Sequence, residues 1–171
     1  EQKEYAEVFD YSKITEKSGV ITDYWTNNLL DLILRKDNLN SAYKQVKKNK
    51  GKGGIDGMQV DELLPFLREN QDTLIRKIRE GKYKPNPVRR VEIPKETKGE
   101  FRKLGVPTVV DRVIQQAIAQ ELSPVYEKQF SENSFGFRPK RGAHDALRQC
   151  QKNVNDGYVY VVDMDLEKFF D

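Results

Sequence analysis

The sequence predicts an α+β fold that is rich in helix, with one long β-hairpin and one buried strand near residue 160. Three observations support this class. Several segments repeat apolar residues every three or four positions, which is the period of an α-helix buried on one face. Residues 88–106 alternate apolar and polar side chains on both sides of a turn signal. Residues 158–162 form a continuous run of valine and tyrosine, which is typical of a strand buried on both faces.

Apolar periodicity places the helices. The first begins near Trp25 and runs to about residue 34, and Asn38 is expected to cap the second. The third covers about 60–80 and stops at Gly81, because glycine ends helices easily. Residues 108–111 (Thr-Val-Val-Asp) resemble a capping box ahead of a helix that ends near Pro124 or a little beyond. A last helix covers about 142–155, after an irregular stretch at 129–142.

Two further segments join these helices. Residues 47–57 hold four lysines and four glycines, so we expect a loop that buries little and whose backbone can approach a ligand closely. Residues 96–99 (Glu-Thr-Lys-Gly) form the turn signal of the hairpin, whose tip is basic.

Two carboxylates follow the expected strand. Asp163 and Asp165 lie two residues apart, so in extended backbone they share one face. Carboxylate oxygens suit Mg²⁺, a hard cation that keeps waters for substrate phosphates. The alternative is a pair of solvated aspartates in a turn. Because a buried strand needs neighbours on both edges, we also expect this chain to be part of a longer protein.

Composition excludes several classes. The chain has 171 residues and one cysteine, so neither an internal disulfide nor a zinc site built on several thiolates is possible. No apolar run approaches the roughly 18 residues of a membrane span, and the N-terminus lacks the order of a signal peptide. We expect a soluble intracellular protein that does not bind membranes.

The net charge of +3 is unevenly distributed. Residues 1–40 carry 5 basic and 8 acidic side chains, residues 41–150 carry 23 and 14, and residues 151–171 carry 2 and 5. A basic middle favours a polyanionic partner, since each phosphate contact releases counterions. A solvated surface with excess lysine is the alternative.

Four blocks, taken in order, resemble one family. Residues 49–57 (Asn-Lys-Gly-Lys-Gly-Gly-Ile-Asp-Gly) resemble a signature of group II intron-encoded enzymes. Ile93-Pro94-Lys95, residues 102–107 and residues 111–117 resemble the family's first fingers block, and residues 134–139 with 144–147 resemble its second. Asp165 with Phe170 five residues later resembles the first catalytic motif of reverse transcriptases. The chain is similar to the group II intron reverse transcriptase, also called a maturase.

The resemblance implies the fingers and the start of the palm of a right-hand polymerase. It divides the chain into a tail or arm at 1–24, an N-terminal extension with the helical part of the fingers at 25–87, the fingers at 88–156 and the start of the palm, with its first strand, at 157–171.

The resemblance also implies roles for single residues. Asp165 would be the catalytic metal ligand, together with the backbone carbonyl of Leu166, while Asp163 would be structural or solvated. Phe170 would be the steric gate that selects deoxynucleotides, and Lys95 and Arg102 would grip the incoming triphosphate. RNA contacts would come from Lys47, Lys48, Lys50, Lys52 and Arg138.

Simpler interpretations of these residues stay open. Phe170 could pack in the core, and the lysines of 47–57 could be an ordinary solvated turn. Lys95 and Arg102 could be two solvated charges of a hairpin. For Phe135 and Phe137 we favour a place in the core over stacking on template bases.

The implied function is RNA-directed DNA synthesis by a nucleotidyltransferase that uses Mg²⁺, together with binding of intron RNA and assistance in RNA splicing. The partners would be group II intron RNA, an RNA template with a DNA primer, and dNTP. The family's Ala-Asp-Asp motif does not occur here, so the fragment alone should bind Mg²⁺ poorly and be inactive. The alternatives are a non-catalytic RNA-binding splicing module and a retron-type reverse transcriptase. We expect the bacterial cytoplasm as the location, with an organelle as the alternative.

Overall fold

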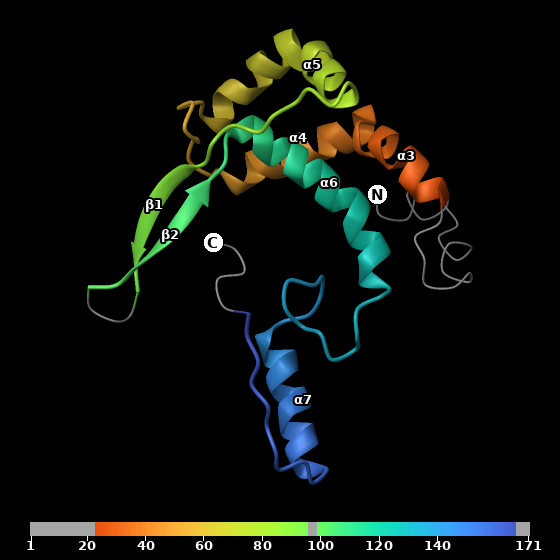
Figure 1. Ribbon diagram of the computed structural model, residues 1–171, viewed down its shortest axis with the longest axis vertical. Coiled ribbons are helices and arrows are strands. Elements are labelled where there is room, and N and C mark those ends of the chain that lie inside the picture. The colour runs from red at the N-terminus through yellow and green to blue at the C-terminus, as the bar shows by residue number, and fades with distance from the viewer. Residues whose placement is uncertain (1–22, 96–98, 167–171) are drawn as a thin grey trace. The chain divides into compact units, whose positions relative to one another are not determined.

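The structure is a computed structural model that describes residues 23–95 and 99–166 (Figure 1). Its elements are, in chain order, α3 (Asp23–Ile33), α4 (Lys36–Asn49), the 3-10 turn η1 (Val60–Glu62), α5 (Leu63–Arg79), β1 (Arg89–Pro94), β2 (Phe101–Val106), α6 (Val109–Glu127) and α7 (Ala143–Asn155). The chain divides into a first compact unit, Glu1–Pro124, and a second, Val125–Asp171. The predicted mixture of helices with a small amount of sheet is confirmed.

The core of the first unit is built by α4, α5 and α6. Leu63 and Val109 are the largest fully buried apolar side chains, and the other buried ones come from the end of α3 and the residue after it, from α4, from η1 and from α6: Ile33, Leu34, Ala42, Val46, Val60, Val110, Val113 and Ala117. Each helix therefore buries one apolar stripe, as the periodicity predicted.

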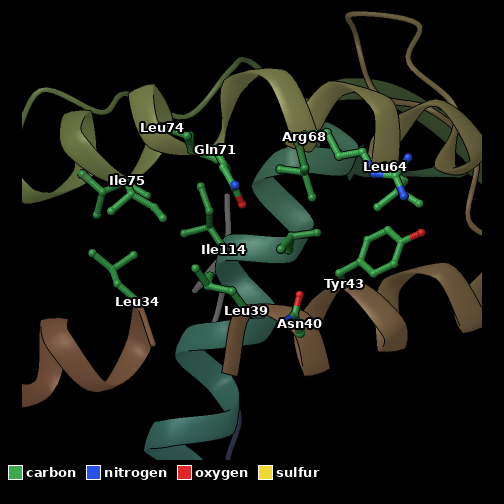
Figure 2. Close-up of a pocket in the computed structure, with 13 residues that line it drawn as sticks. Leu34, Leu39, Asn40, Tyr43, Leu64, Arg68, Gln71, Leu74, Ile75 and Ile114 are labelled. Carbon is green, nitrogen blue, oxygen red and sulfur yellow. The ribbon is translucent and has the colours of Figure 1, made fainter. Parts of the chain in front are cut away.

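An apolar groove of about 220 Å³ remains between these three helices. Figure 2 shows Leu74 and Ile75 of α5 pointing toward Leu39 of α4 and Ile114 of α6. The groove is part of the contact that holds α5 over the other two helices. Its apolar lining explains why α5 keeps an amphipathic sequence along its length.

Asn38 does not cap a helix, contrary to the sequence prediction. It lies inside α4, where its side chain is buried. Its amide donates hydrogen bonds to the carbonyls of Ile33, at 2.9 Å, and of Ala117, at 3.0 Å. Gln120 in turn donates to its carbonyl oxygen atoms. Asn38 therefore ties α4 to α6 across 79 residues of sequence, a role that no local pattern reveals.

The helix cap expected at 108–111 is present at the start of α6, with Thr108 as the capping residue. The Asp111 N–H donates to Thr108 Oγ1 at 3.1 Å, and Thr108 Oγ1 donates to the Asp111 carboxylate at 2.6 Å. That buried carboxylate also accepts hydrogen bonds from the Tyr83 hydroxyl and, at 3.2 Å, from the Asn86 N–H. A single carboxylate thus fixes the chain before β1 against the N-terminus of α6, where a negative charge is favourable.

Burial, followed by the hydrogen bond to Asp111, raises the pKa of Tyr83 far above the usual value for tyrosine. The neutral phenol is therefore favoured in the folded chain. Its contribution to stability is complete below about pH 10, the pKa of an unfolded tyrosine, and is lost as the pH rises through the folded pKa.

Tyr83→Phe is expected to lower the free energy of unfolding by about 1 kcal/mol at neutral pH, and this difference from the wild type should shrink above about pH 10. Urea unfolding followed by circular dichroism from pH 7 to pH 11 measures it. Tyr160→Phe is the matched control, because Tyr160 is 92% exposed. A difference for Tyr83→Phe that grows with pH would contradict the prediction.

The hairpin forms where the alternation predicted it. Strands β1 and β2 pair antiparallel and make up the single sheet of residues 23–95 and 99–166. Ile93 lies opposite Arg102, and Val91 lies opposite Leu104. The hydrogen bonding continues past the strands, since the Lys95 N–H donates to the Glu100 carbonyl at 2.9 Å. The centre of the turn signal, residues 96–98, is outside the described residues.

The second unit differs most from the prediction. α7 has the expected bounds and ends before Gly157, which has a φ of +97°. Its predicted apolar face is open, however, because Leu147 is 66% exposed and Val154 is 59% exposed. An amphipathic helix can keep its form while that face has no partner among the described residues.

The strand expected at 158–162 is absent from the described part of the second unit. These residues have no regular secondary structure and are exposed, with Tyr160 at 92% and Val161 at 88%. A strand requires hydrogen bonds from a neighbouring strand, and β1 and β2 pair with each other. The composition of 158–162 therefore predicted β structure that the described part of the second unit does not contain.

No helix in the described ranges has both the length and the apolar character needed to cross a bilayer.

Candidate nucleic-acid and nucleotide interface

The four lysines expected to bind RNA lie close together in sequence at the end of α4. Lys47 and Lys48 belong to its last turn, Lys50 follows in the left-handed conformation at a φ of +48°, and Lys52 lies in the loop beyond. All four side chains are exposed. Lys47, Lys48 and Lys50 thus lie at the end of the helix, and Lys52 lies in the loop that follows. We call these four residues and the loop that carries them the lysine loop.

The lysine loop is anchored to the rest of the first unit by two arginines. Arg112 of α6 donates to the Lys52 carbonyl at 2.7 Å, and Arg89 of β1 donates to the Gly53 carbonyl at 3.1 Å. The loop, the hairpin and α6 therefore share hydrogen bonds. Neither anchor could be predicted from the sequence, because the bonded residues lie 60 and 36 positions apart in the chain.

The expectation that this loop buries little is confirmed for most of it, because eight of residues 47–57 are exposed, but two glycines are exceptions. Gly53 and Gly54 are both buried. A Cβ on Gly54 would lie 2.6 Å from the Cα of Thr108 and 2.7 Å from its nitrogen. A Cβ on Gly53 would lie 2.5 Å from the carbonyl oxygen of Met58. These glycines let the backbone approach the chain itself rather than a ligand, and they position the lysines.

Lys95 and Arg102 lie on the same face of the hairpin. Arg102 is opposite Ile93, and Lys95 follows two residues after Ile93, so all three side chains leave the same face. Diagonal neighbours of this kind are about 7 Å apart. Lys95 forms an ion pair with Glu100 at 3.1 Å, but both side chains are about half exposed, so the pair is weak. The geometry allows both cations to meet one polyanion.

Asp165 is in the exposed segment after α7. Its carboxylate accepts a hydrogen bond from the Leu166 N–H at 2.9 Å, and Asp163 is also exposed. Phe170 lies outside the described residues. Within residues 23–95 and 99–166, no three His, Cys, Asp or Glu side chains are close enough to share a metal ion. The Asp165 carboxylate and the Leu166 carbonyl have the oxygen chemistry that Mg²⁺ prefers, but they do not make a complete site.

Arg138 is placed differently from the RNA contact that the sequence suggested. Its side chain is only 6% exposed, and its guanidinium donates to the Glu127 carboxylate at 2.8 Å and to the carbonyls of Ser131, at 2.6 Å, and Ser134, at 2.9 Å. The hydrogen bonds that Arg138 donates to the Glu127 carboxylate lower the pKa of Glu127. Arg138 thus holds the irregular stretch before α7 together, and its donors are directed inward.

The two aromatic residues of the same stretch are not equivalent. Phe135 is half-buried, with the guanidinium of Arg141 5.7 Å from the ring centre. Phe137 is fully exposed and has a φ of +55°. The preference for a core position is therefore wrong for Phe137. Its ring is open to a stacking partner.

Comparison with known proteins finds a matching family for the C-terminal part of the chain. Residues 93–171 match the family model described as reverse transcriptase (RNA-dependent DNA polymerase). The chain is 33% identical over 159 residues to the group II intron-encoded protein LtrA of Lactococcus lactis subsp. cremoris, an alignment that covers 93% of this chain and 26% of LtrA.

Two further relatives are proteins with intron names. The chain is 32% identical to the putative COX1/OXI3 intron 2 protein of Saccharomyces cerevisiae, over 95% of this chain and 19% of that protein. It is 43% identical to nuclear intron maturase 2, mitochondrial, of Arabidopsis thaliana, over 36% of this chain and 8% of that protein. The chain thus spans about a quarter or less of these relatives. Residues 93–171 thus match the reverse transcriptase family, and the chain is similar to group II intron-encoded proteins and intron maturases.

Proposed function

We propose that this chain provides the RNA-binding and nucleotide-gripping part of a group II intron reverse transcriptase that also acts as a maturase. The observation that carries this proposal is the shared anchoring of the lysine loop and the hairpin, through Arg89 and Arg112. The first unit thereby holds the four exposed lysines, together with Lys95 and Arg102 of the hairpin, on a backbone that is fixed by hydrogen bonds. We also propose the division that the resemblance implies: a tail or arm at 1–24, the N-terminal extension with the helical part of the fingers at 25–87, the fingers at 88–156 and the start of the palm at 157–171.

In this proposal the lysine loop contacts the phosphates of template or intron RNA. Lysine side chains on a fixed loop supply charge without reading bases, and such contacts position the RNA rather than specify its sequence. Arg138 does not belong to this surface, because its donors are engaged within the second unit. Phe137 is the aromatic residue available for stacking on a template base.

Salt dependence tests the lysine loop. For single-stranded RNA, log K falls by about 0.7 per phosphate contact as log salt rises. Replacing all four lysines with glutamine should therefore make this slope shallower by up to about 3, and should weaken binding of single-stranded RNA at low salt. Fluorescence anisotropy across a salt series measures both.

A variant that loses four cations elsewhere is the matched control. These exposed residues lie outside the lysine loop: Lys36, Lys44, Arg76 and Lys152. Changing them to glutamine should leave the slope of log K against log salt close to that of the wild type. Equal slopes for the two variants would mean that the chain attracts RNA only by its total charge.

Lys95 and Arg102 are proposed to hold the triphosphate of the incoming dNTP. Arginine binds phosphate oxygens in a fork, and lysine adds a point charge. The weak ion pair between Lys95 and Glu100 would give way to a triphosphate.

The double change of Lys95 and Arg102 to alanine, made in the complete gene product, should lower kcat/KM for dNTP by about a hundredfold. Steady-state primer extension at varied dNTP measures this ratio. Lys103→Ala is the matched control, because Lys103 lies opposite Glu92 and leaves the other face of the hairpin. If Lys103→Ala were as harmful as the double change, the assignment to one face would be wrong.

The metal site is proposed for the complete gene product. Asp165 and the Leu166 carbonyl would hold Mg²⁺ together with carboxylates from beyond this chain, and Phe170 would exclude the 2′-hydroxyl of ribonucleotides. The ion would neutralise charge on the transferring phosphate. The 171-residue chain by itself should give no primer extension.

A retron-type enzyme and a non-catalytic splicing module remain the competing assignments. The relatives with intron names favour a place among intron proteins over a retron. A non-catalytic module would lack the roles proposed for Asp165, Phe170 and the pair Lys95 and Arg102, and mutation of Asp165 distinguishes it from our proposal.

A further inference from the structure

A second recess of the first unit has no role in the proposed function so far. It is about 610 Å³ in volume and lies between α5, the chain that follows it and the loop near Met58. This volume is within the range of small-ligand sites. We call it the α5 cleft.

Apolar and aromatic groups contribute to the lining of the α5 cleft. They come from α5 (Phe66 and Leu74), from the chain after it (Tyr83), and from Met58 and Val110. The Tyr83 ring is fixed because its hydroxyl donates to the buried carboxylate of Asp111. Aromatic groups in this lining could contact the face of a planar, weakly polar group.

The α5 cleft also contains more positive than negative charge. Lys77, Lys82 and Lys84 line it, against one carboxylate, Asp56. Lys82 forms an ion pair with Glu80 at 2.8 Å, while Lys77 and Lys84 have no ion pair in the described part of the chain. These two cations are available for an anion.

The turn after α5 fixes this arrangement in advance. The Lys77 carbonyl accepts hydrogen bonds from the N–H groups of Lys82, at 2.8 Å, and Tyr83, at 3.0 Å. Gly81 permits the turn with a φ of +66°. The Tyr83 ring and the backbone that carries Lys77 and Lys82 are therefore fixed before any ligand arrives, which reduces the entropy lost on binding.

An aromatic and apolar lining beside free cations is suited to a base with its phosphate. We propose that the α5 cleft binds one nucleotide, with its base against Phe66, Leu74 and the Tyr83 ring and its phosphate against Lys77 and Lys84. The nucleotide would be an unpaired residue of an RNA strand or a free mononucleotide. This inference rests on the proposed RNA-binding function and adds a site that holds one base.

The test compares binding of a single-stranded oligouridylate and of duplex RNA by fluorescence anisotropy. Thr73 lines the α5 cleft and is exposed, so Thr73→Trp should fill it. Since stacking of one base contributes about 1–3 kcal/mol, we expect about tenfold weaker binding of the single strand and less than twofold change for the duplex. Thr73→Ser leaves the cleft open and should bind as the wild type.

A charge variant keeps the test valid if the tryptophan disturbs folding. Lys77→Gln should weaken binding of the single strand more than binding of the duplex. Arg76→Gln removes a neighbouring charge outside the cleft lining and should change the binding of both RNAs equally. Competition by uridine monophosphate would identify a free nucleotide as the ligand, and its failure to compete would identify a nucleotide within a strand.

Failure of the nucleotide site can be distinguished from failure of the proposed function. If the wild-type chain binds RNA and the Thr73→Trp and Lys77→Gln variants bind as Thr73→Ser and Arg76→Gln do, the α5 cleft holds no nucleotide, and the proposed function stands. If the wild-type chain binds no RNA, the proposed function fails with it.

Discussion

Replacing Gly54 with alanine is expected to destabilise the first compact unit by about 3 kcal/mol. The added Cβ would lie 2.6 Å from Thr108 Cα and 2.9 Å from the Pro107 carbonyl carbon. Both are backbone atoms at the entrance to α6, so no side chain can rotate away. The loop would have to leave α6, and Lys52 would lose its hydrogen bond from Arg112.

Urea unfolding followed by circular dichroism measures this loss. Gly136→Ala is the matched control, because no atom lies within 4 Å of its added Cβ. Its free energy of unfolding should stay within about 0.5 kcal/mol of the wild type. Gly54→Ala should also weaken RNA binding, since the lysine loop would lose its fixed position. Equal stability of the two variants would refute the packing role assigned to Gly54.

Helices and hairpin could be predicted from the sequence because their signals are local. The apolar stripe of α5, the stop at Gly81 and the alternation at 88–106 each lie within a short window. The strand at 158–162 could not be predicted reliably, because a strand depends on partner strands that its own residues do not specify. Asn38 was misassigned for a similar reason, since its partner at Ala117 is 79 residues away.

The sequence predicts which residue types form the candidate site, but it predicts only part of how they are arranged in space. Alternation predicts that side chains two residues apart share a face, and the register places Lys95 and Arg102 accordingly. The glycines at 53 and 54 correctly predicted a backbone that approaches another group closely. Whether that group is a ligand or the chain itself depends on the fold. Arg138 shows the same limit, since an arginine in a basic sequence can bind an internal carboxylate, here that of Glu127.

Asp165→Ala in the complete gene product is expected to reduce DNA synthesis by at least about a thousandfold. The proposal assigns Asp165 to the metal, and a lost carboxylate ligand removes most of the charge neutralisation at the transferring phosphate. RNA binding should not change, because the lysine loop lies in the first compact unit and Asp165 lies in the second. Asp163→Ala is the matched control, two residues away and equally exposed.

The most direct test of the central claim measures two quantities on the complete gene product. These are the rate of primer extension on an RNA template and the affinity for intron RNA, for the wild type, Asp165→Ala and Asp163→Ala. The proposed reverse transcriptase predicts that Asp165→Ala alone loses DNA synthesis and that all three bind RNA equally. Undiminished synthesis by Asp165→Ala, or loss of RNA binding together with synthesis, would contradict it.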